Sequence, residues 1–469
     1  MLAHITPQNI RPTTLVQQDR SNALPGDVDV EQLSLIYYPA KGLTADKYIN
    51  NQSTYNIKDL VPRTQQIDLF YSVFTPTIYC ELQCVDAVDD LHIVDDLHNE
   101  ILGEEYLYLQ YKSPVYNIAD SIRLLFKVYK ISDVVTSPNN RTRSYTIYAA
   151  SCEAIDNATV TVYRSLRTRS GDKGTSISDI VPVILSSDLK SSKPIDIEPT
   201  TGIVDKYLSN LYPLEAIDYL RQIATTTSKK TGSYVFFEKP SGYVFRTLED
   251  LFEKGQKQGP VASYVYDTIG TTDHQLDRYS RAIVYNEMSF VDNYSKIVSG
   301  GFANEVNNLD LVTGKYTTAT YDHSTSRSKA TYADPTDRGY HNTPAYITSY
   351  KNYTYSKYVV SAATDGTNNL PEKLAYQQAY ALELAQNIVQ MAAHGNSKVS
   401  VGDTIALTIQ RPRATTVVGN RIEEPSVAKR ISGNYLISRA RDTIKISSRP
   451  SHLQSFELIK GQFLEERPV

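Results

Sequence analysis

The sequence predicts a mainly β protein with a mixed α+β insert, and three observations lead to that fold class. Segments in which apolar and polar residues alternate recur before residue 155 and again after residue 282. Between these two blocks, residues 156–260 change to a helical period. The composition, with Tyr 36, Phe 11 and Trp 0, favours half-buried strands and subunit contacts, because tyrosine combines a large apolar ring with a hydroxyl that needs a partner.

Length and charge limit the function classes. A chain of 469 residues suggests about three domains. Lys and Arg number 48 and Asp and Glu number 52, so the net charge of -4 argues against a polybasic nucleic-acid binder. No apolar run approaches the ~20 residues that span a bilayer, and residues 1–26 lack the charged and apolar regions of a signal peptide. Three cysteines favour a reducing compartment, so we expect a soluble protein made in a cytoplasm.

The first block consists of strands. Residues 1–30 are polar and contain Pro7, Pro12 and Pro25, which predicts an extended N-terminal arm. Within residues 31–155 we expect a small antiparallel barrel or sandwich. Its predicted strands are 30–38, 66–74, 77–85, 122–129 and 144–155.

The insert at 156–260 combines helices with a hairpin. Residues 176–189 predict a helix with Ser178 at its N-cap and Pro182 in its first turn. Residues 212–224 predict a second helix with apolar residues along one stripe. A hairpin follows, with strands at 232–239 and 243–248 around a Pro-Ser-Gly turn.

The last block, 261–469, again reads as strands, with two interruptions. A polar, Tyr-rich segment at 315–358 predicts a surface that lies over another surface or a neighbouring subunit. A helix is predicted at 371–394, with Pro371 in its first turn and Gly395 as its C-cap. The predicted strands are 282–291, 296–306, 398–410, 434–446 and 453–461. No tandem repeat of short period is visible.

A search for catalytic or metal-binding patterns finds one feature of that kind. The segment DDLHIVDDLHNE at 89–100 contains two acidic pairs, and their carboxylates could hold a divalent cation. His92 and His98 lie six residues apart, which does not place them on one helical face. No further ligand group at a fixed spacing accompanies them, so we favour a solvated acidic helix or loop.

The remaining candidates favour structural roles. Cys80 and Cys84 alternate with Ile78 and Leu82 on one strand face, which indicates buried small side chains rather than a zinc pair. The basic run at 164–173 favours a solvated loop or an acidic partner over a phosphate contact; its charged residues are Arg164, Arg167, Arg169 and Lys173. Walker A, GxSxG and HExxH motifs are absent, and the adjacent Glu104 and Glu105 would face opposite sides of a strand. The sequence therefore predicts no enzyme, metal or cofactor.

Three stretches, taken in order, resemble the baseplate hub proteins of contractile-tailed bacteriophages, which are related to the N-terminal part of type VI secretion spike proteins. The first is TIYCELQCVDAVDDL…ILGEEYLYLQYKSP at 77–114. The second is SISDIVPVIL…YPLEAIDYLRQIA…GSYVFFEKPSGYVFRTLEDL at 176–251. The third is KVSVGDTIAL…SGNYLISRARDTI…HLQSFELIKGQF at 398–463. No single motif is specific, and the Tyr-rich stretch at 315–358 does not match a signature of the family.

The resemblance implies a structural protein of the virion tail baseplate, assembled in the host cytoplasm. It implies two antiparallel β-barrels similar to the tail-tube subunit, linked by smaller mixed domains. Three copies would form a pseudo-six-fold ring, with the six-fold tail tube or its initiator on one side and the three-fold central spike on the other. Other baseplate wedge proteins are further implied partners. DNA would only pass through the channel during ejection, and no membrane insertion is implied.

Two sets of residues are therefore candidates for structural roles. The candidate subunit-contact tyrosines are Tyr316, Tyr321, Tyr332, Tyr340, Tyr346, Tyr350, Tyr353, Tyr355 and Tyr358. The residues that the resemblance places in barrel strands are Gly103, Glu104, Gly402, Asp403, Gly433, Tyr435 and Phe456. Two alternatives stay open: a Tyr-rich receptor- or glycan-binding tail-tip protein, and a cell-wall hydrolase that would depend on Asp95.

Overall fold

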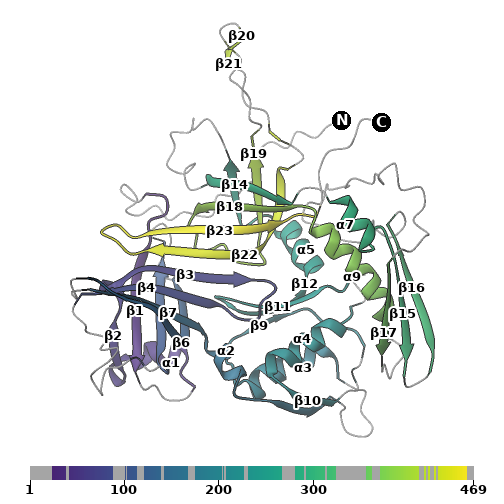
Figure 1. Ribbon diagram of the computed structural model, residues 1–469, viewed down its shortest axis with the longest axis horizontal. Helices are drawn as coiled ribbons and strands as arrows, with labels where there is room; N and C mark the ends of the chain where they lie inside the picture. The colour runs from purple at the N-terminus through teal and green to yellow at the C-terminus, as the bar shows by residue number, and fades with distance from the viewer. Residues whose placement is uncertain are drawn as a thin grey trace.

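A computed structural model describes most of the chain. The described residues are 24–37, 42–87, 101, 103–113, 121–138, 142–166, 175–202, 204, 207–226, 231–266, 280–289, 292–311, 314–323, 355–361, 370–410, 417–418, 421–422, 427–428 and 431–461. Residues 1–23 of the predicted arm and the acidic segment 89–100 lie outside them. The protein is mostly β, as predicted, and strands from both ends of the chain form one large sheet (Figure 1).

The main sheet has 13 strands. Those before the insert are β1 (Asp29–Tyr37), β2 (Asn56–Asp59), β3 (Thr64–Ser72), β4 (Tyr79–Asp86), β5 (Tyr106–Lys112), β6 (Ile122–Thr136) and β7 (Arg143–Ser151). Those after it are β13 (Ala262–Tyr266), β14 (Ala282–Ser289), β18 (Ile388–His394), β19 (Thr404–Ile409), β22 (Gly433–Lys445) and β23 (Ser451–Ile459). The predicted alternation is present in β4, where Cys80, Leu82 and Cys84 are buried.

The same arrangement of five antiparallel strands occurs twice in this sheet. In the first half the spatial order is β5–β6–β7–β4–β3. In the second half it is β19–β22–β23–β18–β14. If the five strands of each set are numbered in chain order, their order across the sheet is third, fourth, fifth, second and first in both sets. Each half has one more strand beside the third strand of its set. In the first half this strand, β1, is antiparallel to β5, whereas in the second half β13 is parallel to β19.

The halves are joined strand to strand. Strand β22 pairs with β19 through residues 433–436, and beyond a bulge its residues 439–445 pair with β3 on the same side. Neither half closes through a continuous ladder of paired strands in the described part of the chain. Between β13 and β14 there is a single bridge, Val265 to Arg281, and near β1 the Leu60 amide donates to the Leu33 carbonyl at 2.9 Å.

One hydrophobic core serves both halves. It contains buried residues of the first half such as Leu69, Leu82 and Leu107, together with Ile405 and Phe456 of the second half. Burying each such side chain contributes roughly 1.5–3 kcal/mol. The buried side chains of the two halves therefore form one contiguous cluster.

The insert combines helices and strands, as predicted, and part of it packs in a second core. Its helices are α2 (Cys152–Asn157), α3 (Ile177–Val183, continued by a π-helical turn Ile184–Asp188), α4 (Pro213–Ile223) and α5 (Leu248–Gln258). Its strands are β8 (Val162–Ser165), β9 (Ile195–Ile197), β10 (Tyr207–Leu211), β11 (Tyr234–Lys239) and β12 (Gly242–Thr247). The predicted hairpin is β11–β12, and its aromatic rings stack in the second core.

A third unit lies between β14 and β18. It consists of α7 (Asn293–Val298), β15 (Ala303–Asp310), β16 (Tyr316–Asp322), β17 (Tyr355–Ser361) and α9 (Leu370–Leu384). Helix α9 lies against the three-stranded sheet at the right of Figure 1, where Val306 and Tyr321 pack on Ala375 and Tyr376. The remaining short elements are α1 (Ala45–Asn50), β20 (Val417–Val418) and β21 (Arg421–Ile422).

Several predicted boundaries are wrong. The helix predicted at 371–394 ends at Leu384, and residues 388–394 form β18, because Val389, Met391 and Ala393 alternate onto the core between β14 and β23. This pairing overrides the local helix preference of the alanines. The strand predicted at 296–306 begins only at Ala303 after helix α7, and the one predicted at 144–155 ends at Ser151, where α2 starts. The N-cap of α3 is Ser176, whose hydroxyl accepts the Asp179 amide, rather than Ser178.

Candidate assembly surface

The outer side of the junction between the halves is held by a buried carboxylate. Asp68 on β3 accepts hydrogen bonds from Arg441 Nε (3.1 Å) and Thr443 Oγ1 (2.6 Å) on β22 and from Gln66 Nε2 (2.6 Å). Burial by itself would raise the pKa of Asp68, but these hydrogen bonds hold that pKa below its usual value. The Arg441 guanidinium also lies over the Phe70 ring, 5.3 Å from its centroid. The junction is thus a charge-assisted contact between residues more than 370 positions apart.

The core side of the same junction is also polar. The Tyr111 hydroxyl of β5 donates to Asp442 Oδ2 of β22 at 3.2 Å, and the Tyr111 ring meets the edge of His452. Burial raises the pKa of Tyr111 well above its ordinary value, so the hydroxyl stays protonated and remains a donor. Both sides of the sheet therefore tie the first half to the second.

An ionic cluster with two buried carboxylates attaches the insert to the first half. The Lys193 ammonium lies 2.6 Å from carboxylate oxygens of both Glu153 and Glu238. Glu238 also accepts hydrogen bonds from the Ser151 hydroxyl (2.6 Å) and the Ile78 amide (3.2 Å). Burial opposes the charge on Lys193, but the two carboxylates raise its pKa above the usual value. Removing Lys193 would leave two buried carboxylates without their cation, which is strongly destabilising.

A second buried lysine attaches α9 to the insert. The side chain of Lys373 is buried, and its ammonium donates to the carbonyls of Gln222 (2.8 Å) and Ala224 (2.5 Å) at the C-terminus of α4. A cation at this end satisfies carbonyls that the helix leaves unpaired and complements its dipole. Burial, together with the nearby charge of Arg221, lowers the pKa of Lys373 to about 7.

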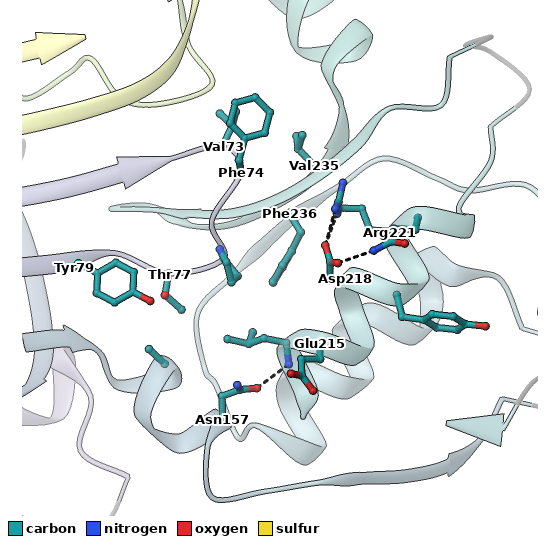
Figure 2. A pocket seen from close by; sticks show the side chains of 15 residues that line it. Val73, Phe74, Thr77, Tyr79, Asn157, Glu215, Asp218, Arg221, Val235 and Phe236 are labelled. Carbon is teal, nitrogen blue, oxygen red and sulfur yellow. Dashed lines mark hydrogen bonds and ion pairs between the residues drawn. The ribbon is translucent and has the colours of Figure 1, made fainter. Parts of the chain in front are cut away.

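Two neighbouring hollows mark the surface beside the junction. One, of about 720 Å³, lies between the end of β3, α2 and α4 (Figure 2). The other, of about 690 Å³, crosses β3, β22, β23, β18 and β14. Phe74 and Tyr79 line both, and Phe74 is 53% exposed although it is a large apolar side chain. Exposed aromatic groups next to hollows are typical of contact surfaces.

The carboxylates of the first hollow have structural roles. Asp218 forms an ion pair with Arg221 at 2.6 Å, which Figure 2 shows at the edge of the hollow. Glu215 accepts the backbone amide of Tyr212 and so caps α4. The amide of Leu214 donates to the Asn157 side chain, which links α4 to α2. These contacts hold α4 in place beside α2.

The candidate tyrosines fall into three groups. Tyr316 and Tyr358 are exposed, at 58% and 77%. Tyr321 is buried against Tyr376 of α9, so it belongs to the small core of this unit. Tyr355 is the first residue of β17. The others lie outside the described residues: Tyr332, Tyr340, Tyr346, Tyr350 and Tyr353.

The two exposed tyrosines share the face of the β15–β17 sheet that is turned away from α9. Leu309 of β15 faces Tyr316, and Asn307 faces Tyr358. The Asn307 side chain accepts the Tyr316 hydroxyl at 2.6 Å and the Thr318 hydroxyl at 2.8 Å. The result is a sheet face with aromatic and apolar side chains around a satisfied polar centre, a composition suited to a protein interface.

The residues that the resemblance placed in barrel strands lie at turns and in the core. Gly103 and Glu104 precede β5, Gly433 begins β22, and Tyr435 and Phe456 are buried on β22 and β23. Gly402 and Asp403 form the turn before β19. Gly402 has φ +80°, and a Cβ there would lie 2.7 Å from the Phe237 ring. The Asp403 carboxylate accepts the Ser400 amide at 3.0 Å.

The predicted structural role of the cysteines is confirmed, since Cys80 and Cys84 are buried on β4. Burial raises the pKa of Cys84 to about 11. In the basic run, Arg164 pairs with Asp188 at 3.0 Å, whereas Arg167, Arg169 and Lys173 lie outside the described residues. His92, His98 and Asp95 lie outside them too. Within the described ranges, no cluster of three or more His, Cys, Asp or Glu is arranged to bind a metal, and no helix is long and apolar enough to cross a membrane.

Sequence reasoning missed the polar groups that join the parts of the molecule. Asp68, Lys193 and Lys373 carry no local signature, because their partners lie about 40 to more than 370 positions away. A charged residue in an otherwise apolar strand pattern, such as Asp68 between Ile67 and Leu69, is the one signal that was available.

No protein-family model and no curated protein sequence matches the chain. Several solved structures are similar to it. The tail protein from Neisseria meningitidis MC58 has 9% identity and a TM-score of 0.49 over 91% of this chain and 96% of that chain. The 43 kDa tail protein of prophage MuSo2 from Shewanella oneidensis has 10% identity and a TM-score of 0.47, over 92% and 98%.

The third is the E. coli c3393 protein, a component of the type VI secretion system, with 9% identity and a TM-score of 0.41 over 87% of this chain and 78% of that chain. All three are tail or type VI secretion proteins, the class that the three sequence stretches resemble. At identities of 9–10% and TM-scores below 0.5, these likenesses do not assign a function.

Proposed function

We propose that the chain is the structural baseplate hub of a contractile phage tail, a homotrimer whose six tube-like halves form a pseudo-six-fold ring. The ring would join the six-fold tail tube to the three-fold central spike and would continue the channel for DNA ejection. Wedge proteins of the baseplate are its further expected partners. The proposal assigns no enzymatic activity and no cofactor to the chain.

The observation that carries this proposal is the repeated strand arrangement. Each half has the same order of five antiparallel strands, and β22 and β3 join the halves side by side. Two equivalent halves per chain are what a trimer needs to present six similar faces. The order of the three sequence stretches, which resembles the hub family, supports the same reading.

The two contacts that reach across the open side of each half support a barrel in each. In the second half this contact is the bridge from Val265 to Arg281, and in the first half it is the hydrogen bond from Leu60 to Leu33, which extends the β1–β2 ladder to the residues just before β3. Closing a sheet on itself removes its exposed edges, which otherwise recruit other strands. The small net charge of -4 suits a channel that DNA passes without being held.

The mass of the purified chain tests the proposal. We expect a particle of three times 52.6 kDa by light scattering or native mass spectrometry, and density for the chain at the tip of the tail tube in images of the virion. A chain that stays monomeric at all concentrations and is absent from the tail would contradict it.

A second candidate is a receptor- or glycan-binding tail-tip protein. The exposed pair Tyr316 and Tyr358 around the polar Asn307 favours it, because aromatic faces beside hydrogen-bonding groups can stack on sugar rings. Replacing both tyrosines by alanine separates the two functions. If adsorption to cells falls while particles still assemble, glycan binding is supported over the hub contact.

A further inference from the structure

The contact that joins the halves has an equivalent position elsewhere in the molecule. In each half, one row of residues crosses four neighbouring strands directly after a bulge. In the second half this row is Arg439, Glu457, Gln390 and Asn286. In the first half it is Lys130, Tyr148, Glu81 and Asp68. The rows place β22 on β6 as far as Ser132 and β3 on β14 as far as Glu287, beyond which β6 and β14 each have a further register shift.

Strands β22 and β6 share the bulge that precedes this row. In β22 the register with β23 shifts between Ile437 and Arg439, and in β6 the register with β7 shifts between Val128 and Lys130. Before the bulge, β22 pairs with β19 and β6 pairs with β5. Beyond it, residues 439–445 of β22 pair with β3. Residues 130–136 of β6 have no strand on that side among the residues that the structure describes.

Strand β14 is the counterpart of β3 in the second half. One side of β3 pairs with β4 and the other with β22. One side of β14 pairs with β18, and on the other side the described residues provide only the bridge at Arg281, just before the strand. Among the residues that the structure describes, there is thus one filled junction between halves, together with the two unfilled sides of a second one.

Both unfilled sides expose apolar side chains. On β14, Val284 and Met288 are 54% and 55% exposed, and on β6, Val134 and Val135 are 49% and 61% exposed. An open strand edge with apolar side chains is a template for pairing with another strand. In Figure 1, β14 lies near the top of the sheet and β6 near the bottom, so one chain does not bring the two edges together.

We propose that β14 of one copy pairs in antiparallel fashion with residues 130–136 of β6 in the next copy, which repeats the β3–β22 junction between chains. The inference rests on the proposed assembly of the chain into a ring and names the surface that forms it. The two edges differ, so the contact is heterologous, and such contacts generate closed rings when the rotation closes. Since Phe70 faces Arg441 within the chain, Met288 should face Ser132 of the next copy.

Disulfide trapping in the full-length chain tests this pairing. Chains with Met288→Cys and chains with Ser132→Cys are mixed and mildly oxidised, and a cross-linked dimer is expected only in the mixture. The parent chain controls for Cys80, Cys84 and Cys152. The pair Phe70→Cys and Arg441→Cys in one chain controls for the oxidation, because it should form the equivalent bond within the chain.

A charge placed on either edge gives the second measurement. Met288→Lys or Val135→Lys should raise the concentration needed for assembly by about tenfold or more, as for a residue at the centre of an interface. Both side chains are exposed, so the fold should be retained, as circular dichroism would show. Tyr207→Lys, at an equally exposed position of the insert, should leave assembly unchanged.

The outcomes are distinct. Cross-linking in the mixture, with assembly lost in the lysine variants, supports the pairing. Cross-linking of Met288→Cys chains to one another without the second variant would overturn it, because that result requires a two-fold contact. Trimers that persist in both lysine variants, without cross-linking in the mixture, would overturn the pairing while leaving the proposed function intact. A parent chain that is monomeric and absent from tails would overturn both.

Discussion

The two halves of the sheet share one strand order but differ in how their first two strands are connected. In the first half, β3 and β4 are joined by residues 73–78. In the second half, residues 290–387 lie between β14 and β18 and include β15–β17 and α9. The pairing of the strands therefore does not depend on the connection between the first two, because cross-strand pairs and a common core hold the strands. The loop is free to carry surface features, and the exposed tyrosines lie there.

The halves also differ in what their equivalent edges contact. The edge of β3 is filled by β22, and Asp68 is buried there with three hydrogen-bond donors. The equivalent edge of β14 carries the exposed Asn286. At the edge that pairs with β22, the charged side chain of Asp68 is buried and hydrogen-bonded. At the edge of β14, the side chain of Asn286 is neutral, and water can hydrogen-bond to it.

The largest effect should come from a charge in the shared core. Ile405 on β19 and Leu107 on β5 occupy equivalent positions, facing Tyr435 and Phe126, and both are fully buried. Ile405→Asp and Leu107→Asp should each prevent folding, since an unpaired buried carboxylate costs more than about 4 kcal/mol. Soluble yield and circular dichroism would measure this. Val265→Asp, on the exposed side of β13, should still fold, and a variant that keeps one folded half would contradict the single core.

Lys373 tests how the second half's long connection is anchored. Its folded pKa of about 7 lies below its ordinary value, so between these pH values the unfolded chain binds a proton that the folded chain does not. Stability should therefore rise with pH from about 7 to 10, with a slope of up to about 1.4 kcal/mol per pH unit. In Lys373→Met this contribution should disappear. Urea unfolding of both proteins at several pH values measures the difference. If stability depended on pH in the same way in both proteins, the lowered pKa of Lys373 would be contradicted.

The equivalent residues Asp68 and Asn286 compare the filled edge with the unfilled one. Asp68→Ala should lower the free energy of unfolding by about 1–3 kcal/mol, because Thr443 and Gln66 lose their acceptor. Asn286→Ala should change it by less than about 0.5 kcal/mol in the unassembled chain, as at other exposed sites. Chemical denaturation of both variants gives the comparison, and equal losses would contradict the equivalence.

The pH dependence of Asp68 sharpens this comparison. Its folded pKa is lowered, so its contribution is complete above the ordinary Asp pKa of about 4 and is lost as the pH falls through the folded pKa. Asp68→Asn should therefore show a shallower loss of stability below pH 4 than the parent chain. Acid titration followed by circular dichroism measures it.

The smallest effect on stability is expected at the exposed tyrosines. Tyr316→Ala and Tyr358→Ala should change the free energy of unfolding by less than about 0.5 kcal/mol and weaken assembly. Tyr321→Ala is the matched control, because its ring is buried against Tyr376 and its loss should cost about 3 kcal/mol. Light scattering and thermal melts separate the two effects. Equal destabilisation by all three variants would contradict the division between core and surface.

The local sequence was sufficient wherever a pattern repeats within one element. The alternation in 66–74 and 77–85 predicted β3 and β4, and the apolar stripe in 212–224 predicted α4. In the candidate surface, the exposed Tyr316 and Tyr358 were found from composition, whereas Tyr321 was assigned to the surface although it is buried. Its burial depends on α9, which lies far along the chain.

The amino-acid sequence by itself determined that this protein is mainly β, that a mixed unit interrupts its strands, and where most strands and helices lie. Periodicity and turn residues act over a few positions, so a short segment is enough to specify them. Only the tertiary structure decided that 388–394 is a strand, that Asp68 meets Arg441 and that Lys373 reaches α4. These depend on which distant segments become neighbours in the sheet, and local patterns do not encode that choice.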